Sequence, residues 1–298
     1  MKYIDIHAHA YRKPVPFVTE FCTPAELIRR YDKYGIEAGF VLPVVNSEIY
    51  LPQANEDILE IAAAHPDRFI PFCNIDPRCL TNSCTAPLDT VLQYYKDKGC
   101  KGVGEIMPNM ESEDPRVLNL LACAEKVGLP VTWDGSDRTY GDFGLCDQRG
   151  LPSFERILQW FPNLIVFAHG PIFWRELVEL DTAAQRKPVF DNTGEYLFGN
   201  QQMRGPLIRN GVVQKLFRSY PNLLGELSEA ATVLPLDEDY GPEFLTEFQD
   251  RLYFGSDICT KECPMDMARI LLKWKAEKRI TDEVFYKIAK GNAEKFFA

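Results

Sequence analysis

The sequence predicts an α/β protein: a single (β/α)8 barrel of the TIM type with an extended loop after its sixth strand. Three observations indicate this fold. The chain has 298 residues, which suits a barrel that takes roughly 250 residues as one domain. Hydrophobic residues make up 46% of it, enough to fill a large core. Short runs rich in Val, Ile and Leu alternate with longer stretches of helical periodicity. We therefore expect one domain over residues 1–298.

Eight apolar runs are expected to form the barrel strands. Several are apolar on both faces, as parallel strands are when side chains fill the barrel and helices cover its outside. In chain order the runs are Tyr3–His7, Ala38–Val45, Arg68–Ile75, Gly102–Ile106, Leu129–Trp133, Leu164–Ala168, Leu223–Leu227 and Leu252–Gly255.

Helices are expected between these runs. Thr23-Pro24-Ala25-Glu26 is typical of a helix start, with a capping residue and a proline at the first helical position. Further helices are expected at Asn55–Ala64, Pro87–Lys98, Pro115–Val127, Ser153–Phe161, Met265–Glu277 and Thr281–Phe297.

The connection from Gly170 to Pro221 is long for a barrel. Loops that follow strand ends build substrate sites in this fold. The segment over 170–221 is therefore either a lid that brings Trp174, Tyr196 or Phe198 to the pocket, or a surface excursion that only pads the barrel.

Composition excludes several classes of function. The net charge is −10, with 33 Lys and Arg against 43 Asp and Glu and no basic stripe, so nucleic acid is not an expected partner. No apolar run is long enough to cross a membrane, and we expect no signal peptide. Nine cysteines without a C-x-x-C pair fit a reduced compartment. We expect a cytoplasmic protein with a small-molecule substrate, for which a homodimer is one candidate assembly.

Two of the four histidines, His7 and His9, lie at the end of the first run. Residues i and i+2 of a strand point to the same side, so both imidazoles can reach one point inside the barrel mouth. This spacing predicts a divalent metal ion, with zinc as the first choice and manganese as the second. His65 precedes the third run, at the opposite face, and is expected to be structural.

Three further residues end strands at the same mouth. His169 follows the sixth run, just before Gly170 and Pro171 turn the chain away, and Asp257 follows the eighth, beside the first strand once the barrel closes. Glu105 lies in the apolar fourth run, where an unpaired carboxylate would be costly. A cation is its expected partner, and an ion pair with Lys101 or a nearby arginine is the alternative. The cysteines are expected to be small buried side chains, except Cys259, whose position leaves its role open.

These motifs resemble the amidohydrolase superfamily, and specifically the amidohydrolase-related family that contains aminocarboxymuconate semialdehyde decarboxylase. The similar phrases span the chain: Asp5–His9, Asn55-Glu56, His65–Phe69, Phe161–Leu164, Ala168–Gly170, Phe254–Asp257 and Gly291–Ala293. The resemblance implies a metal held at the carboxyl end of the barrel, with Asp257 as ligand and base and His169 as a ligand or an acid.

One departure concerns the fifth strand, where family members usually carry a metal-binding histidine. This chain has Asp134 there, which is a candidate for the metal or for the substrate. Glu105 resembles the glutamate of a related branch and would replace the missing histidine. His7, His9, Glu105 and Asp257 then form a complete set, which frees His169 for acid or base work.

Three functions follow from this resemblance. The first is a hydrolase that attacks a small organic substrate with a metal-activated water, for which the departure at the fifth strand and Glu105 argue. The alternative is a metal-dependent, non-oxidative decarboxylase of a small unsaturated or aromatic acid, and a barrel that only binds a ligand is the third. Substrate contacts are expected from Arg12, Arg78, Trp133 and Trp174, with ordinary solvated charge as the alternative for the arginines.

Overall fold

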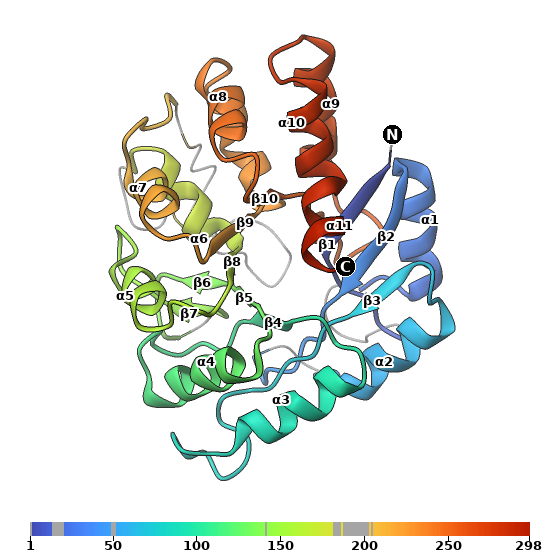
Figure 1. The fold of residues 1–298 in the computed structure, drawn as a ribbon, viewed down its shortest axis with the longest axis vertical. Coiled ribbons are helices and arrows are strands. Elements are labelled where there is room, and N and C mark those ends of the chain that lie inside the picture. The colour runs from blue at the N-terminus through green and yellow to red at the C-terminus, as the bar shows by residue number, and fades with distance from the viewer. Residues whose placement is uncertain are drawn as a thin grey trace.

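The computed structural model describes residues 2–13, 21–48, 52–140, 142–180, 186, 203 and 205–298. Within these residues, parallel strands form a central wall that helices surround (Figure 1). Its strands are β1 (Tyr3–Ala8), β2 (Ile36–Val41), β3 (Phe69–Pro71), β4 (Val103–Ile106), β5 (Val131–Trp133), β8 (Val166–Ala168), β9 (Leu223–Glu226) and β10 (Leu252–Tyr253). Each overlaps one of the eight predicted runs.

The wall closes into a barrel. The strands pair in the orders β1-β2-β3 and β10-β9-β8-β5-β4. A parallel bridge between Cys73 and Val103 joins β3 to β4. At the other seam, Ile6 N donates to Phe254 O over 3.0 Å, and Ala8 forms a parallel bridge with Ile258. The predicted (β/α)8 barrel is therefore confirmed.

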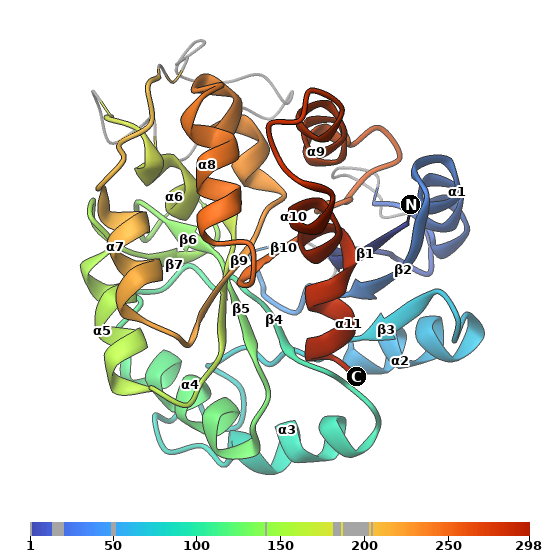
Figure 2. The same cartoon turned by 45° about the horizontal axis from the view of Figure 1, so that its top comes forward.

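Most of the predicted helices are present outside the strands (Figure 2): α1 (Pro24–Tyr34), α2 (Asn55–Ala64), α3 (Leu88–Asp97), α4 (Pro115–Val127), α5 (Pro152–Trp160) and α9 (Asp266–Ala276). The capping box at Thr23 is also as predicted: the Thr23 side chain accepts from Glu26 N, and Glu26 accepts from Thr23 N. The predicted Thr281–Phe297 helix is instead α10 (Asp282–Tyr286), a π turn at Lys287–Gly291 and α11 (Asn292–Phe296).

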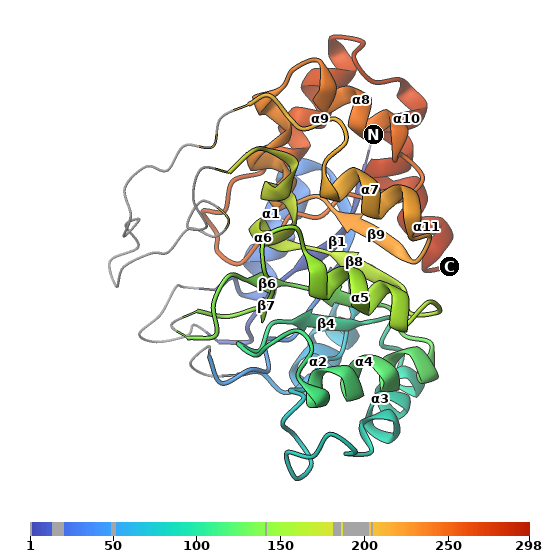
Figure 3. The ribbon, with the colours of Figure 1, turned by 90° about the vertical axis from the view of Figure 1, so that its left-hand side faces the viewer.

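Several short elements were not expected from the sequence. They are the β6–β7 pair (Gly135–Ser136 and Leu145–Cys146), α6 (Gly170–Trp174), α7 (Val212–Ser219), α8 (Tyr240–Glu247) and 3-10 turns at Arg175–Leu177, Glu229–Thr232 and Leu234–Leu236. β6, β7 and α6 lie together beyond the ends of the strands that precede them (Figure 3). They help to form the rim of the barrel mouth.

Aromatic side chains fill the end of the barrel opposite this rim. Phe40, Phe72 and Phe167 form one inner cluster with Ile6, Leu42, Leu224, Tyr253 and Ala293. Phe297 lies 4.2 Å from Phe40 and 6.1 Å from Phe167, measured between ring centroids, so the C-terminal segment plugs this end. Apolar contacts close this end of the barrel, and the polar groups lie at the opposite end. No helix among the described residues is long and apolar enough to cross a membrane.

Candidate metal centre

His7 and His9 reach the barrel mouth because β1 is irregular. Ile4 and Ile6 belong to the inner cluster, whereas Asp5 faces outward and accepts from the Tyr31 hydroxyl of α1. Strict alternation would place His7 on the same side as Asp5. The pairing of β1 with β2 shifts register between Asp5 and Ala8, and such a shift re-aims side chains. Both imidazoles are consequently buried in the mouth.

Glu105 and Asp257 meet these imidazoles from two other strand ends. The β4–β5 pairing shifts register between Val103 and Ile106, around Glu105, which is 5% exposed. Asp257 follows β10 with φ +46°, a left-handed conformation that is uncommon for aspartate, and its N–H donates to His7 O over 2.9 Å. The backbone therefore departs from regular strand geometry at both carboxylate residues.

The four side chains converge at distances typical of metal ligands. His7 Nε2 and His9 Nε2 are 3.1 Å apart, and each lies 3.5 Å from Glu105 Oε2. Asp257 Oδ1 is 3.7 Å from His7 Nε2 and 3.5 Å from His9 Nε2. Ligand atoms about 2.1 Å from one tetrahedral zinc ion would be about 3.4 Å apart. The spacing of each carboxylate from the two imidazoles therefore fits ligands of one small divalent cation.

The hydrogen bonding of His9 supports the same conclusion. Its Nδ1 lies 3.0 Å from Leu42 O. A carbonyl oxygen can only accept, so Nδ1 carries the proton and a neutral ring presents the Nε2 lone pair to Glu105 and Asp257. A lone pair that faces two carboxylates is repelled unless a proton or a metal ion lies between them. The donor set is therefore suited to a bound cation.

The charged groups shift one another in the direction expected of such a set. Burial lowers the pKa of His7, but the Glu105 and Glu226 carboxylates outweigh it and hold that pKa well above its usual value. Burial raises the pKa of Glu105, but His169, His7 and His9 lower it far below its usual value. In the metal-free chain, protons on the imidazoles therefore supply positive charge that a metal ion could supply instead.

His169 lies beside this set. One of its ring nitrogens faces Glu105 and Asp257, and the other faces Glu226. Its Nε2 is 3.4 Å from Glu105 Oε1 and 3.9 Å from Asp257 Oδ2. Its Nδ1 contacts Glu226 Oε2 in a close ion pair. Burial and the neighbouring His7 lower the pKa of His169, but Glu105 and Glu226 outweigh them and raise it to about 9. The paired carboxylate fixes the ring and leaves Nε2 facing the centre.

Glu226 is the site residue that sequence reasoning missed. It ends β9, is fully buried, and also accepts from Ser228 N and Ser228 Oγ. A signal was available, because Gly225-Glu226 repeats at the seventh strand the Gly104-Glu105 pair of the fourth. Gly255 leaves space for the Glu226 carboxylate, because a Cβ there would lie 1.7 Å from Glu226 Oε1.

Asp134, at the fifth strand, is 1% exposed and forms a second grouping with Glu105 and His169 in which the potential ligand atoms lie within 4.8 Å of one another. Gly170 leaves room for it: its φ is +81°, and a Cβ there would lie 2.1 Å from Asp134 Oδ1. The structure therefore brings together all six residues expected at the metal. Glu105 contacts imidazoles, and no lysine or arginine pairs with it among the described residues.

The residues expected to bind substrate lie elsewhere. Arg12 Nη1 pairs with Asp57 over 3.0 Å and with Glu60 over 2.6 Å, and Arg78 pairs with Asp76 over 2.5 Å and Glu48 over 3.2 Å. Both guanidinium groups are thus engaged by carboxylates. Trp133 and Trp174 are buried in the core between strands and helices.

Trp174 donates its indole N–H to Glu226 O over 2.8 Å, so it supports the end of β9. Because both arginines are already paired and both tryptophans are buried, none of these four side chains is part of the proposed substrate site. Tyr196 and Phe198 lie outside the described residues, and the prediction of a lid over 170–221 stays a prediction.

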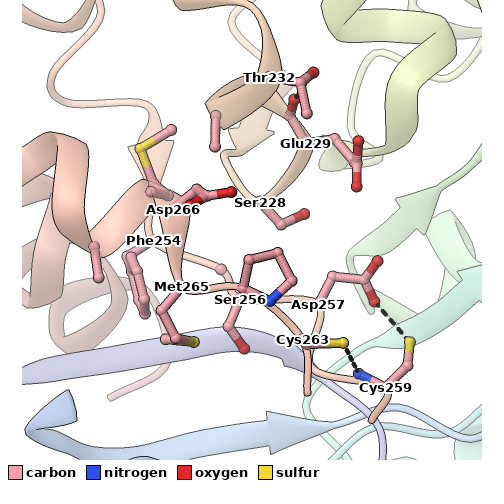
Figure 4. Close-up of a pocket in the computed structure, with 15 residues that line it drawn as sticks. Ser228, Glu229, Thr232, Phe254, Ser256, Asp257, Cys259, Cys263, Met265 and Asp266 are labelled. Carbon is pink, nitrogen blue, oxygen red and sulfur yellow. Dashed lines mark hydrogen bonds between the residues drawn. The ribbon is translucent and has the colours of Figure 1, made fainter. Parts of the chain in front are cut away.

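A cavity of about 200 Å³ opens beside Asp257. Figure 4 shows Asp257, Cys259 and Ser256 on one side of it and Glu229 and Thr232 on another. Met265 and Cys263 also line it. Burial raises the pKa of Glu229, and Asp257 adds to this rise. A small molecule in this cavity could approach Asp257.

The fold and the site together define a (β/α)8 barrel with potential metal ligands gathered at the carboxyl ends of its strands. A family model described as Amidohydrolase (Amidohydro_2) matches residues 4–298. The chain belongs to this amidohydrolase family, which is metal-dependent, and is an enzyme of the amidohydrolase superfamily. The resemblance found in the sequence is thereby confirmed. None of the curated proteins matches the chain.

Solved structures with the same fold cover nearly the whole chain. An uncharacterised TIM-barrel protein from Bordetella bronchiseptica is 20% identical with a TM-score of 0.65, covering 99% of this chain and 98% of its own. A 5-carboxyvanillate decarboxylase from Novosphingobium aromaticivorans, complexed with manganese and 4-hydroxy-3-methoxy-5-nitrobenzoic acid, is 16% identical with a TM-score of 0.62, covering 99% and 96%. A probable 2-pyrone-4,6-dicarboxylic acid hydrolase from Acinetobacter baumannii is 13% identical with a TM-score of 0.56, covering 100% and 99%.

Proposed function

We propose that this chain is a metal-dependent, non-oxidative decarboxylase of a small unsaturated or aromatic acid. The observation that carries the proposal is the His169–Glu226 pair, which holds an imidazole with Nε2 directed at Glu105 and Asp257. The sequence placed hydrolysis first and decarboxylation second, and we reverse that order.

The reaction requires a proton donor next to the substrate carbon. Non-oxidative decarboxylation proceeds when the carbon that bears the carboxylate gains a proton. The bond to the carboxyl group then breaks, its electron pair restores the π system, and carbon dioxide leaves. Glu226 accepts a hydrogen bond from His169 Nδ1–H and stabilises the imidazolium, so His169 can hold a second proton at Nε2 and deliver it. His169 is left neutral and regains its proton from solvent.

The metal would be held by His7, His9, Glu105 and Asp257, with zinc or manganese as candidates. When bound, it supplies positive charge that attracts and orients the substrate carboxylate and a neighbouring oxygen. Arg12 and Arg78 are already paired with acidic side chains. This pairing is consistent with a metal, rather than either arginine, as the group that holds the substrate acid.

The comparisons support the same class of reaction. Among the similar structures are three described as 5-carboxyvanillate decarboxylases and one described as a 2,6-dihydroxybenzoate decarboxylase complexed with 2,6-dihydroxybenzoate. The identities are 14% to 16%, and therefore these likenesses support the reaction only as a proposal.

Hydrolysis is the second candidate because Asp257 both faces the cavity and belongs to the ligand set. In that reaction Asp257 would accept the proton of the attacking water, and His169 would protonate the leaving group. One similar structure is described as a probable 2-pyrone-4,6-dicarboxylic acid hydrolase.

One experiment separates the two reactions. Protein loaded with zinc or with manganese is incubated in D2O with hydroxybenzoates and carboxylated vanillates, and in parallel with lactones, esters and amides. We expect carbon dioxide in amounts equal to the product, with one deuterium at the carbon that lost the carboxyl group. Turnover of the lactone, ester or amide panel without decarboxylation of any acid would overturn the proposal in favour of hydrolysis.

A matched pair of variants tests the proton donor. His169→Asn should lower turnover by roughly 100-fold to 10,000-fold, the range typical of losing a general acid. His65→Asn removes a histidine outside the mouth and should leave turnover unchanged. Full turnover in His169→Asn would exclude this histidine as the donor.

A further inference from the structure

Cys259 lies beside the proposed metal centre, although the four ligands assigned above do not include it. Asp257 and Cys259 are two residues apart and flank Ile258, which bridges to Ala8 of β1. His9 N donates to Ile258 O over 2.9 Å, and Asp257 N donates to His7 O over 2.9 Å. Residues 257–259 therefore lie alongside residues 7–9, which include both histidines.

The thiol occupies a position typical of a ligand. Cys259 Sγ is 3.5 Å from Asp257 Oδ1, the same oxygen that lies 3.5 Å from His9 Nε2. The ligand atoms of His9, Asp257 and Cys259 all lie within 4.8 Å of one another. A thiolate about 2.3 Å from zinc and a carboxylate oxygen about 2.1 Å from it are separated by roughly 3.1–3.8 Å when they are neighbouring ligands of a four- or five-coordinate ion. Figure 4 shows this contact at the wall of the cavity.

The other cysteines near the cavity or in the core have different surroundings. Cys73 and Cys100 are buried in the hydrophobic core. Cys263 shares the cavity with Cys259, but its sulfur accepts from Cys259 N and Thr260 N, both over 3.3 Å. Cys259 alone among these four directs its sulfur at a carboxylate of the proposed ligand set.

We propose that Cys259 binds the metal as a thiolate, on the side of the centre that faces the cavity, together with His9 and Asp257. This inference rests on the proposed metal centre. Binding releases the thiol proton to solvent. A thiolate favours soft or borderline ions such as Cd²⁺, Co²⁺ and Zn²⁺ over the harder Mn²⁺. The chain would then differ in metal preference from the manganese-bound decarboxylase structure that shares its fold.

Cobalt reports thiolate ligation directly. Metal-free protein is titrated with Co²⁺ under reducing conditions, and absorption is recorded through the near-ultraviolet and the visible. We expect a sulfur-to-cobalt charge-transfer band that saturates at one equivalent. Cys259→Ser should lose this band while it keeps the weaker visible bands of bound cobalt. Cys263→Ser is the matched control and should keep both, because its hydroxyl can still accept from the same amides.

Affinity gives a second measurement that needs no substrate. Cys259→Ser should weaken Cd²⁺ binding by roughly tenfold or more while Mn²⁺ binding changes little. Bound cobalt without a charge-transfer band in the parent, or a band that persists in Cys259→Ser, would overturn the thiolate but leave the proposed function standing. Absence of any cobalt, cadmium or manganese binding would overturn the metal centre itself and this inference with it.

Discussion

At the scale of single residues, the chemistry of the site depends first on two imidazole nitrogens. They belong to His7 and His9 and lie 3.1 Å apart. A separation of this size suits two ligands of one metal ion, and in the metal-free protein a proton shared between the two rings can satisfy the same pair. The i, i+2 spacing was readable in the sequence, whereas the ring nitrogens that face each other are known only from the structure.

Removing these nitrogens tests the metal centre at the level of single residues. We expect His7→Ala and His9→Ala each to lose most bound metal, measured by elemental analysis of dialysed protein. Each variant removes one proposed ligand and leaves the Glu105 and Asp257 carboxylates without their cation. His65→Ala, which changes a histidine outside the mouth, should keep the metal content of the parent. Full metal content in both mouth variants would disprove the assignment.

Glu226 and His169 form a second unit at this scale. Because the Glu226 carboxylate helps to hold the pKa of His169 at about 9, Glu226→Gln should lower that pKa in the metal-free protein. The chain has four histidines, so NMR titration of labelled histidine resolves each of them, and His169→Asn assigns the signal. An unchanged pKa in Glu226→Gln would show that Glu226 does not support the charged ring.

At the scale of elements, the strand ends explain what sequence could and could not predict. The eight strands follow from apolar runs of the right length, and the helix at Thr23 follows from its capping residues, so both were predictable. Register irregularities are different. Those in β1 and β4 depend on how neighbouring strands pair, which local sequence does not encode. His7, His9 and Glu105 were nevertheless found, because their residue types were unusual in apolar strands.

Glu226 was missed although it, too, is a glutamate preceded by glycine in an apolar run. Its strand, β9, alternates regularly, with Leu224 and Glu226 both facing inward. The apolar neighbours Leu223, Leu224 and Leu227 made the run look like core. The short helices α6 and α7 were also missed, because they span only five and eight residues and each makes few helical turns.

The approach of β10 to β9 yields a prediction at this scale. A Cβ at position 255 would lie 1.7 Å from Glu226 Oε1 and 2.4 Å from its carboxyl carbon. Gly255→Ala should therefore displace Glu226 and lower the melting temperature, with a loss of stability of about 1–3 kcal/mol, the range for overpacking. The control is Gly211→Ala, where a Cβ would come no closer than 3.1 Å to a neighbouring atom. Equal melting temperatures in both variants would contradict the close fit at Gly255.

At the scale of the whole molecule, the proposed ligands come from β1, β4 and the segment after β10, so a bound ion would tie distant parts of the wall together. Binding to the folded chain alone stabilises it by about 2.7 kcal/mol when free metal is 100 times its dissociation constant. Zinc should therefore raise the melting temperature of the metal-free protein. The His7→Ala, His9→Ala double variant is the control and should show no rise.

The metal-free protein should also lose stability as pH rises. Because the folded-state pKa of His169 is raised from 6.5 to about 9, its contribution is fully present below about pH 6.5 and is lost as pH rises through about 9. Denaturant unfolding of metal-free protein across this range measures the slope. His169→Asn should flatten it, and an equally steep slope in that variant would assign the effect to other groups.

The seam where β10 meets β1 also determines when the centre can form during synthesis. Ser256 hydrogen-bonds Asp5 across a separation of 251 residues. A ribosome adds about 5–20 residues per second, so the histidine pair waits roughly ten to fifty seconds before Asp257 and Cys259 are made. During that interval the nascent chain offers two imidazoles without the carboxylate and thiol that complete the set. Metal acquisition is therefore expected as one of the last steps of the protein's biogenesis, after the carboxyl-terminal strand has joined the first.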